Sequence, residues 1–279
     1  MKNLIFLFFF SFSIYSQSLP PIQSYTPQEY NAANQNWKIS ESPDNEILFA
    51  NSEALLLFNG TSWNNYNSPN ESVLRSVKNI DDKIYIGSHS DFGYFQRVNN
   101  GTFEYTSLVN LLDLNIEEDE EFWNILLLDN WIIFQSISRL IFIDKNNNDV
   151  KYLKFKGIIN NSFSIEKQIY IALDNGLYKL INGQPEQILN STQIPSLIVN
   201  IFNSEKGMLI LTANNGFYLL KESGLVSKFS SPLDSLKDDL SIFSAIQLSD
   251  SSYAIGSVGQ GLFLLDSNFK NFQKIDKSK

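Results

Sequence analysis

Two short apolar runs around a polar turn recur along the chain, and this pattern is the first guide to its fold. The stretch "IYIALDNGLYKL" begins at Ile169, and a near copy, "LILTANNGFYLL", begins at Leu209. An Asn-Gly pair between two β-rich runs is typical of a β-hairpin with a two-residue type I′ turn, in which both central residues have positive φ. The pattern therefore predicts a hairpin in each copy, with positive φ at Gly176 and Gly216.

The same shape occurs four more times, as "ILFANSEALLLF", "IYIGSHSDFGYF", "IIFQSISRLIFI" and "AIGSVGQGLFLL". The six copies begin at positions 47, 84, 132, 169, 209 and 254, so the repeat is 37 to 48 residues long. Four-stranded propeller blades repeat at roughly 40 to 45 residues. Only the last three copies have glycine at the turn, so we expect the first three hairpins to turn with other chemistry, such as a longer loop around "SHSDFG".

Each hairpin is flanked by two further strand-like runs. An apolar run such as "VLRSVKNI" precedes the hairpin, and a run such as "FNGTSWNNY" follows it. Several hairpin strands are apolar on both alternating faces, which is typical of sheets packed face to face. We therefore predict an all-β protein, a β-propeller of four-stranded antiparallel blades with six repeats in residues 36–279. A β-sandwich and two small β-domains are the alternatives, and the regular period argues against both.

The first residues have the features of an export signal. Lys2 precedes an apolar stretch from Leu4 to Tyr15, and the small Ser16 follows it. This arrangement predicts a signal peptide over residues 1–16 and an exported protein, either periplasmic or the periplasmic part of an inner-membrane protein. An uncleaved anchor is the alternative, but the stretch is shorter than the roughly 20 residues that span a bilayer as a helix. Residues 17–35 then form an N-terminal segment and a candidate closing strand.

Composition narrows the classes of function. The chain has 30 acidic and 21 basic residues and a net charge of −9, so direct contact with nucleic acid is not expected. It has no cysteine and a single histidine, His89, which excludes a zinc site of the usual spacing. His89 is either a general base or, more simply, a turn residue that hydrogen-bonds locally. We expect no metal and no cofactor.

Two other features could carry chemistry. The acidic run "NIEEDEEF", from Asn115 to Phe122, could hold Ca²⁺ or a cationic ligand, but it lacks the alternating Asp/Asn residues and the turn glycine of a calcium loop. A solvated loop or a short helical turn is the simpler interpretation. The four tryptophans either pack in the cores of the blades or, as an exposed pair, form a platform on which a sugar stacks. They are Trp37, Trp63, Trp123 and Trp131.

Recognisable catalytic signatures are lacking. Neither a serine or cysteine nucleophile motif nor a phosphate-binding glycine loop occurs. We therefore assign no catalytic, cofactor-binding or metal-binding residue, predict that the protein is not an enzyme, and leave the ligand-binding residues unknown.

The first two repeats resemble a known family. The features that carry the resemblance are "NQNW" before the first hairpin, "FNGTSWNNY" after it, "LRSV" at the start of the next blade and "IYIGSHSDFGYF" as its hairpin. They are similar to the periplasmic sensor propellers of the two-component regulator propeller proteins with a triple-tyrosine domain. These proteins are hybrid two-component or helix-turn-helix transcriptional regulators. The resemblance covers most of the chain from about Asn31, and the later repeats match only the general propeller pattern.

The resemblance implies a sensor role. In such regulators an exported propeller is followed by an immunoglobulin-like triple-tyrosine domain, a transmembrane helix and a cytoplasmic output module, either a histidine kinase or a helix-turn-helix domain. The sequence stops at Lys279, after the sixth repeat, so we expect either the N-terminal part of a longer regulator or a short relative that acts alone. The resembling sensor propellers carry further blade repeats beyond this point, so with six repeats we also expect an incomplete ring whose sixth blade does not pack fully on the first.

Three functions follow for this chain. The first is an extracytoplasmic sensor that binds a small molecule, an oligosaccharide or a partner protein. The second is an exported propeller enzyme such as a polysaccharide lyase, for which one histidine and three arginines leave few catalytic groups. The third is a purely structural protein-interaction propeller.

Overall fold

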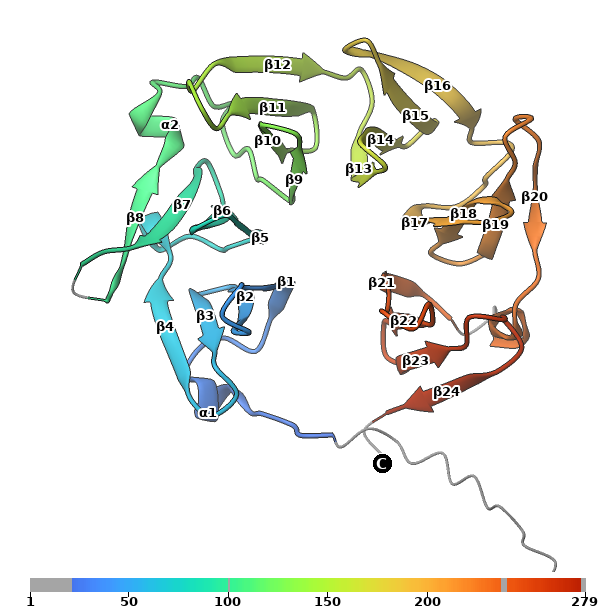
Figure 1. The fold of residues 1–279 in the computed structure, drawn as a ribbon, viewed down its shortest axis with the longest axis horizontal. Helices are drawn as coiled ribbons and strands as arrows, with labels where there is room; N and C mark the ends of the chain where they lie inside the picture. Colours follow the sequence, from blue (N-terminus) through green and yellow to red (C-terminus); the bar gives the residue numbers. More distant parts are fainter. Residues whose placement is uncertain (1–21, 100, 237–239, 277–279) are drawn as a thin grey trace, which may run out of the picture.

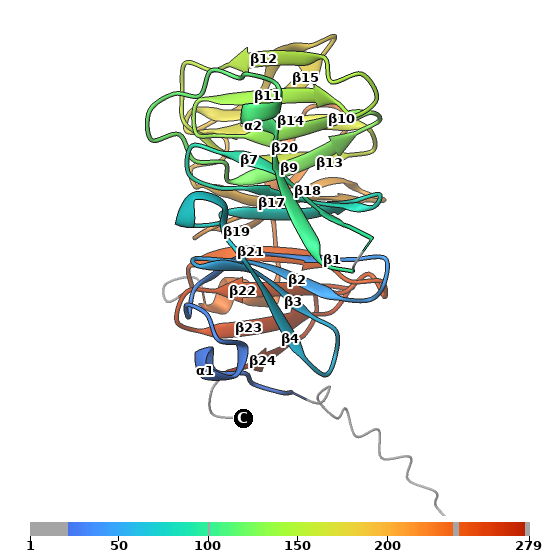
Figure 2. The ribbon, with the colours of Figure 1, turned by 90° about the vertical axis from the view of Figure 1, so that its left-hand side faces the viewer.

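The computed structural model describes residues 22–99, 101–236 and 240–276, and the predicted signal peptide lies outside this part. Six four-stranded antiparallel sheets are arranged around a common axis (Figure 1). In every sheet the strands follow chain order, and the first strand lies nearest the axis. Seen from the side, the molecule is a disc, and the strands run from one flat side of the disc to the other (Figure 2). The predicted all-β propeller with six blades is confirmed.

The blades have the following strands. Blade one has β1 (Asn36–Glu41), β2 (Ile47–Asn51), β3 (Ala54–Phe58) and β4 (Trp63–Asn67). Blade two has β5 (Ser76–Ile80), β6 (Lys83–Gly87), β7 (Phe92–Arg97) and β8 (Phe103–Ser107). Blade three has β9 (Asn124–Leu128), β10 (Trp131–Gln135), β11 (Arg139–Asp144) and β12 (Val150–Lys154). Blade four has β13 (Ile159–Ile165), β14 (Gln168–Leu173), β15 (Gly176–Ile181) and β16 (Gln184–Asn190). Blade five has β17 (Ile198–Ser204), β18 (Gly207–Thr212), β19 (Gly216–Leu220) and β20 (Val226–Phe229). Blade six has β21 (Ile242–Gln247), β22 (Tyr253–Ser257), β23 (Gly261–Leu265) and β24 (Phe272–Ile275).

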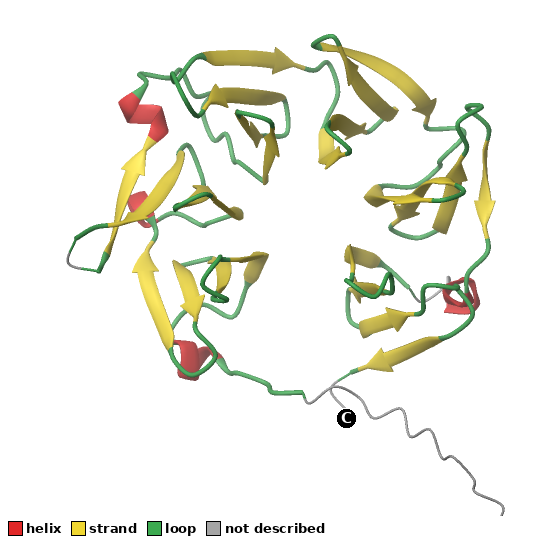
Figure 3. Ribbon diagram, viewed as in Figure 1, coloured by secondary structure: helices red, strands yellow, loops and turns green. Residues whose placement is uncertain are grey.

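Short helices lie only at the periphery of the ring in the described part of the chain (Figure 3). They are the α-helices α1 (Pro27–Tyr30) and α2 (Leu108–Leu111) and the 3₁₀ turns η1 (Pro69–Glu71) and η2 (Pro232–Leu236). None of the described helices is long and apolar enough to cross a membrane.

The predicted hairpins are confirmed, but the type I′ turn is wrong. Gly176 and Gly216 have positive φ, 147° and 63°, as expected. A type I′ turn centred on Asn175 and Gly176 also needs positive φ at Asn175, and that residue does not have it. The reason is the register: Gly176 pairs with Leu173 as the first residue of β15, so it follows the turn instead of forming its centre.

The first three hairpins, which lack the glycine, have side-chain hydrogen bonds at their turns. Asn51 Oδ1 accepts from Glu53 N at 3.0 Å, Ser88 Oγ donates to Asp91 O at 2.9 Å, and Ser136 Oγ accepts from Arg139 N at 3.2 Å. Hairpins five and six have such bonds as well as the glycine, since Thr212 Oγ1 donates to Gly216 O and Ser257 Oγ donates to Gly261 O.

The hydrophobic core is divided among the interfaces between successive blades. Five apolar clusters join blade one to two, two to three, three to four, four to five and five to six. In the second of these, the rings of Phe92 and Phe134 are stacked with centroids 4.1 Å apart, and both are fully buried. Each blade is therefore stabilised mainly by its neighbours, since a single four-stranded sheet cannot bury both of its apolar faces.

The sixth interface is open. No apolar cluster joins blade six to blade one among the described residues, and the two blades stand apart in Figure 1. Ile39 on β1 is 63% exposed and Ile246 on β21 is 57% exposed. The prediction of an incomplete ring is confirmed.

The N-terminal segment covers part of the free face of blade one. The ring of Tyr25 meets Trp63 edge-on with centroids 5.3 Å apart, and the buried Tyr30 of α1 packs with Leu56. The described residues before α1, 22–26, form no strand, so the closing strand expected in residues 17–35 stays a prediction.

Candidate functional site

The antiparallel blades give the ring two ends with different loops. The turns between the second and third strands, and the connections from one blade to the next, lie at one end, which we call the hairpin end. The turns between the first and second strands, and between the third and fourth, lie at the opposite end. His89, the acidic run, Trp37 and Trp123 lie at the hairpin end. Trp63 and Trp131 begin β4 and β10 at the opposite end, where an open cavity also lies.

At the hairpin end, Arg75 lies over the rings of two tryptophans that meet edge-on. Arg75 precedes β5, and its guanidinium carbon lies 4.1 Å from the ring centroid of Trp37 and 4.4 Å from that of Trp123. Its Nη2 donates to Glu121 Oε1 at 2.8 Å. The motifs "NQNW" and "LRSV" therefore meet in one cluster across three blades. Each of these indoles has a face in contact with Arg75, so that face is not open for a sugar to stack on, as a sugar-stacking platform would require.

The acidic run is tied to blades two and three by ion pairs. Glu120 and Arg139 form a buried pair, with Arg139 Nη2 2.5 Å from Glu120 Oε2. Glu117 pairs with Lys154 at the surface, 2.7 Å apart. The expected solvated loop is therefore wrong for Glu120, because the partner arginine lies 19 residues later and only the fold brings it near. No group of three or more metal-binding side chains occurs in the described part of the chain.

His89 contacts the same acidic run. Its Nε2 lies 3.5 Å from Asp119 Oδ1, and its backbone forms an isolated β-bridge with Glu121. The side chain is 43% exposed. In place of the local turn hydrogen bond that we expected, these contacts join His89 to residues thirty and thirty-two positions later.

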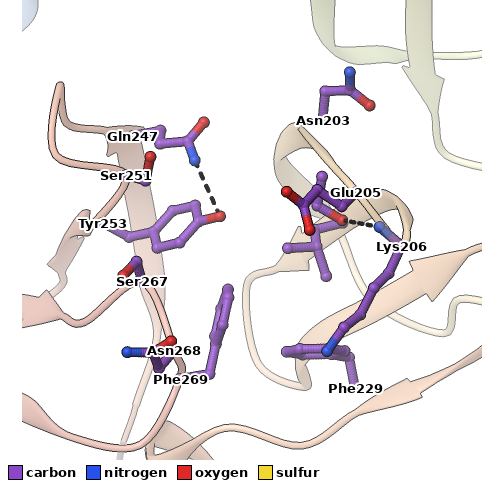
Figure 4. A pocket seen from close by; sticks show the side chains of 12 residues that line it. Asn203, Glu205, Lys206, Phe229, Gln247, Ser251, Tyr253, Ser267, Asn268 and Phe269 are labelled. Carbon is purple, nitrogen blue, oxygen red and sulfur yellow. Dashed lines mark hydrogen bonds between the residues drawn. The ribbon is translucent and has the colours of Figure 1, made fainter.

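A cavity of about 580 Å³ opens between blades five and six at the opposite end (Figure 4). It is lined by the turns β17–β18, β21–β22 and β23–β24. Three aromatic rings form its floor: Phe269 lies between Phe229 and Tyr253, with centroid distances of 4.9 Å and 5.0 Å. In Figure 4, Tyr253 and Phe269 are on one side of the cavity and Phe229 is on the other, with Lys206 beside it.

Polar groups surround this aromatic floor. Gln247 Nε2 donates to Tyr253 Oη at 3.2 Å. Burial raises the pKa of Tyr253, so its hydroxyl is protonated at neutral pH and can donate a hydrogen bond. Glu205 and Lys206 reach the cavity and form no ion pair within the described residues. Aromatic walls with a few polar groups, in a volume of roughly 300 to 1,000 Å³, are typical of small-ligand sites.

No sequence motif predicted this cavity. Its lining residues come from polar turns that resemble every other turn of the repeat. The distinguishing signal is the aromatic residue at a turn, Phe269 in "SNFKN", where most copies have only polar residues.

Comparisons with known proteins give matches among solved structures. No family model and no curated protein matches the chain. The extracellular domain of BT4673 from B. thetaiotaomicron, described as a hybrid two-component system, superposes with a TM-score of 0.67 at 16% identity, covering 88% of this chain and 33% of that one. A second structure of that domain gives 0.68 at 16% identity, covering 87% and 34%. A structure of YCF48 bound to D1 peptide gives 0.67 at 12% identity, covering 91% and 87%.

These likenesses show the fold. The chain is a β-propeller, and its resemblance to sensor propellers is confirmed at the level of the fold. It spans about a third of the length of the solved sensor domains that it matches.

Proposed function

We propose that this chain is an extracytoplasmic ligand-binding propeller that serves as the sensor part of a membrane-spanning transcriptional or two-component regulator. The likeness to extracellular sensor domains supports this role, as do the matching motifs of the first two repeats. The ligand binds outside the cytoplasm, and the state of the propeller is passed to domains in a longer chain.

The cavity between blades five and six is the observation that carries the proposal. It has an aromatic floor, polar groups with free hydrogen-bonding capacity and an opening to solvent, and it lies between two blades. A ligand there contacts three turns from blades five and six, so binding changes how these blades pack. Movement of one blade against another is a physical means of transmitting the signal.

The alternatives have less support. A lyase needs a general base next to its substrate, and His89 contacts the acidic run at the other end of the ring from the cavity. YCF48, which shares the fold, was solved with a peptide, so peptides belong among the ligands to be tested.

Calorimetry with defined ligands tests the proposal. A panel of neutral oligosaccharides, acidic oligosaccharides and short peptides is titrated into the purified protein, and the same mixtures are assayed for unsaturated lyase products. We expect one class to bind without product formation, and Phe229→Ala or Lys206→Met to abolish or weaken that binding. The matched control is Ser191→Ala, in a separate cavity of about 370 Å³ at the hairpin end. Binding that survives both cavity variants, or release of lyase products, would contradict the proposal.

The expected export has its own measurement. Residues 1–16 have the pattern of a signal peptide, so the mature protein is expected to begin near Gln17. N-terminal sequencing of protein from the periplasmic fraction checks this expectation. Recovery of intact Met1 in the membrane fraction would show an uncleaved anchor instead.

A further inference from the structure

A smaller cavity lies in the core between blades two and three, beside α2 at the outer edge of the ring (Figure 1). Its volume is about 210 Å³. Its apolar lining includes Leu108, Ile132 and Ile143, which belong to the cluster that joins these two blades, and the exposed Leu111 of α2. Its polar lining comes from β6, β7 and the turn between β11 and β12. The cavity therefore joins an apolar wall to a polar one.

The register of blade two brings three polar side chains of this cavity to one face of the sheet. Lys83 and Tyr85 are two residues apart on β6, so their side chains lie on the same face. Tyr94 of β7 pairs directly with Tyr85, and directly paired residues share a face. The ring centroids of the two tyrosines are 5.6 Å apart, and Lys83 Nζ lies 4.0 Å from the ring centroid of Tyr94. All three side chains line the cavity.

The hydroxyl of Tyr85 is the group that points to a ligand. Tyr85 is only 6% exposed, and its hydroxyl forms no hydrogen bond within the described part of the chain. The hydroxyl is nevertheless not among the described polar atoms that are sealed from solvent, so it is reached through the cavity. Burial is the main cause that raises the pKa of Tyr85 to about 12, so the hydroxyl is protonated at neutral pH and can donate. A buried hydroxyl without a protein partner needs a solute or water to take its hydrogen bond.

The charges around the cavity favour an anionic group. The ammonium of Lys83 forms no ion pair within the described residues. The second lysine of the cavity, Lys145, pairs with Asp81, with its Nζ 2.7 Å from Oδ2. The adjacent Asp82 accepts a hydrogen bond from Gln96 Nε2 at 2.7 Å. Both carboxylates of the β5–β6 turn therefore have a partner other than Lys83, and no acidic residue lines the cavity.

We propose that this cavity binds a small carboxylate with an apolar body, such as a single aromatic ring or a short alkyl chain. The carboxylate accepts charge-assisted hydrogen bonds from Lys83 and Tyr85, which gives the buried hydroxyl its partner. The apolar body lies against Leu108, Leu111 and Ile143. The volume is below the roughly 300 Å³ at which sites for drug-sized ligands begin, so the cavity selects a ligand of this smaller size. The site includes no residue of the cavity between blades five and six and does not rest on the proposed function.

Titration of the purified protein with benzoate and with hexanoate, followed by the NMR signals of each compound, tests the site. Benzyl alcohol matches benzoate in size but has no charge, and acetate has the carboxylate without the apolar body. We expect benzoate or hexanoate to bind at least tenfold more tightly than either control compound. Tyr85→Phe removes only the hydroxyl, and Lys83→Met removes the charge from a side chain of similar length. Each variant is expected to weaken the binding about tenfold.

Variants at matched positions separate binding from folding. Tyr170 has the same place in β14 as Tyr85 has in β6 and is also buried, but it lies outside the cavity, so Tyr170→Phe should keep the affinity. Lys221→Met removes an exposed amine in the β19–β20 turn and should keep it too.

A variant at the exposed side of the cavity tests the site without a change in the core. Leu111 is 56% exposed, and Leu111→Glu should weaken the binding more than Leu111→Gln does, because it adds a negative charge beside the carboxylate. Failure of both benzoate and hexanoate to bind, or an affinity no greater than that of benzyl alcohol, would overturn the proposal. Binding that survives both Lys83→Met and Tyr85→Phe would do the same.

Discussion

At the scale of single residues, burial decides which members of the acidic run matter for stability. The side chains of Glu120 and Arg139 are 3% and 5% exposed, whereas those of Glu117 and Lys154 are 49% and 65% exposed. Water screens the second pair and reaches the first hardly at all. Loss of one partner therefore has a different cost in each pair.

The first prediction concerns the buried pair. Glu120→Gln is expected to lower the free energy of unfolding by about 3 kcal/mol, because it leaves the guanidinium of Arg139 buried without a counter-charge. Urea denaturation measures the change. Glu117→Gln, in the same run, is the control and should have a much smaller effect. Equal losses in the two variants would show that burial of the pair is not what stabilises this loop.

Two lysines on innermost strands, Lys38 on β1 and Lys78 on β5, predict how stability depends on alkaline pH. Below the lowered pKa of Lys38, both the folded and the unfolded chain carry the proton, and the folded chain bears the cost of a charge that the surrounding protein partly desolvates, although Lys38 is exposed. As the pH rises through that pKa toward the ordinary value of 10.5, the unfolded chain binds more protons than the folded one, so the free energy of unfolding contributed by this group rises. Lys78 acts in the same direction. The difference in stability between the parent and the Lys38→Met, Lys78→Met double variant should therefore shrink as the pH is raised, measured by urea denaturation in chloride buffers. A difference that is constant with pH would contradict it.

At the scale of elements, the hairpin glycines are required for two separable reasons. A Cβ at Gly176 would lie 2.1 Å from the backbone oxygen of Leu189 in the next strand. At Gly183, with φ of 78°, a Cβ would meet nothing within 4 Å. The first position is limited by both dihedral angle and space, and the second by the dihedral angle alone.

The third prediction uses this contrast. Gly183→Val should cost roughly 1 to 3 kcal/mol through backbone strain. Gly176→Val should cost more, because β15 and β16 must also separate. Gly216→Val should fall between them, since its neighbours, Asp234 Oδ1 at 2.8 Å and Lys228 Nζ at 2.9 Å, are the ends of flexible side chains. Thermal and urea unfolding of the three variants measure the order of their stability losses. Parent-like stability of Gly176→Val would contradict the close pairing of β15 with β16 at Gly176.

At the scale of the whole molecule, the opening between blades six and one leaves apolar surface uncovered. Natural β-proteins avoid uncovered sheet faces and edges, because these associate with other chains. The N-terminal segment covers Leu56 and Trp63 of blade one but leaves Ile39 on β1 63% exposed.

The fourth prediction follows from this surface. The isolated protein should self-associate with increasing concentration in sedimentation velocity experiments. Ile39→Lys and Ile246→Lys together should shift it toward the monomer, since they place charge on both sides of the opening. Leu225→Lys adds charge at a residue that is 59% exposed in the β19–β20 turn and should change little. A protein that is monomeric at all concentrations, or a control that acts as strongly, would contradict the role of the opening.

The alternation and spacing of apolar residues determined the architecture by themselves. The runs that begin at Ile47 and Ile169 became the hairpins β2–β3 and β14–β15, because two faces of each strand must be buried and a strand's neighbours in the sheet are its neighbours in sequence. Positive φ at Gly176 was predictable from the Asn-Gly pair, although the turn type depended on a pairing register that the sequence does not show.

Only the tertiary structure decided what the blades bring together. Arg75 contacts Trp37 and Trp123, and Glu120 forms an ion pair with Arg139. Aromatic rings from two blades form the floor of the cavity. These residues are far apart in sequence, and no periodicity links them. Their contacts depend on the angle and distance between successive sheets, which the packing of whole interfaces sets.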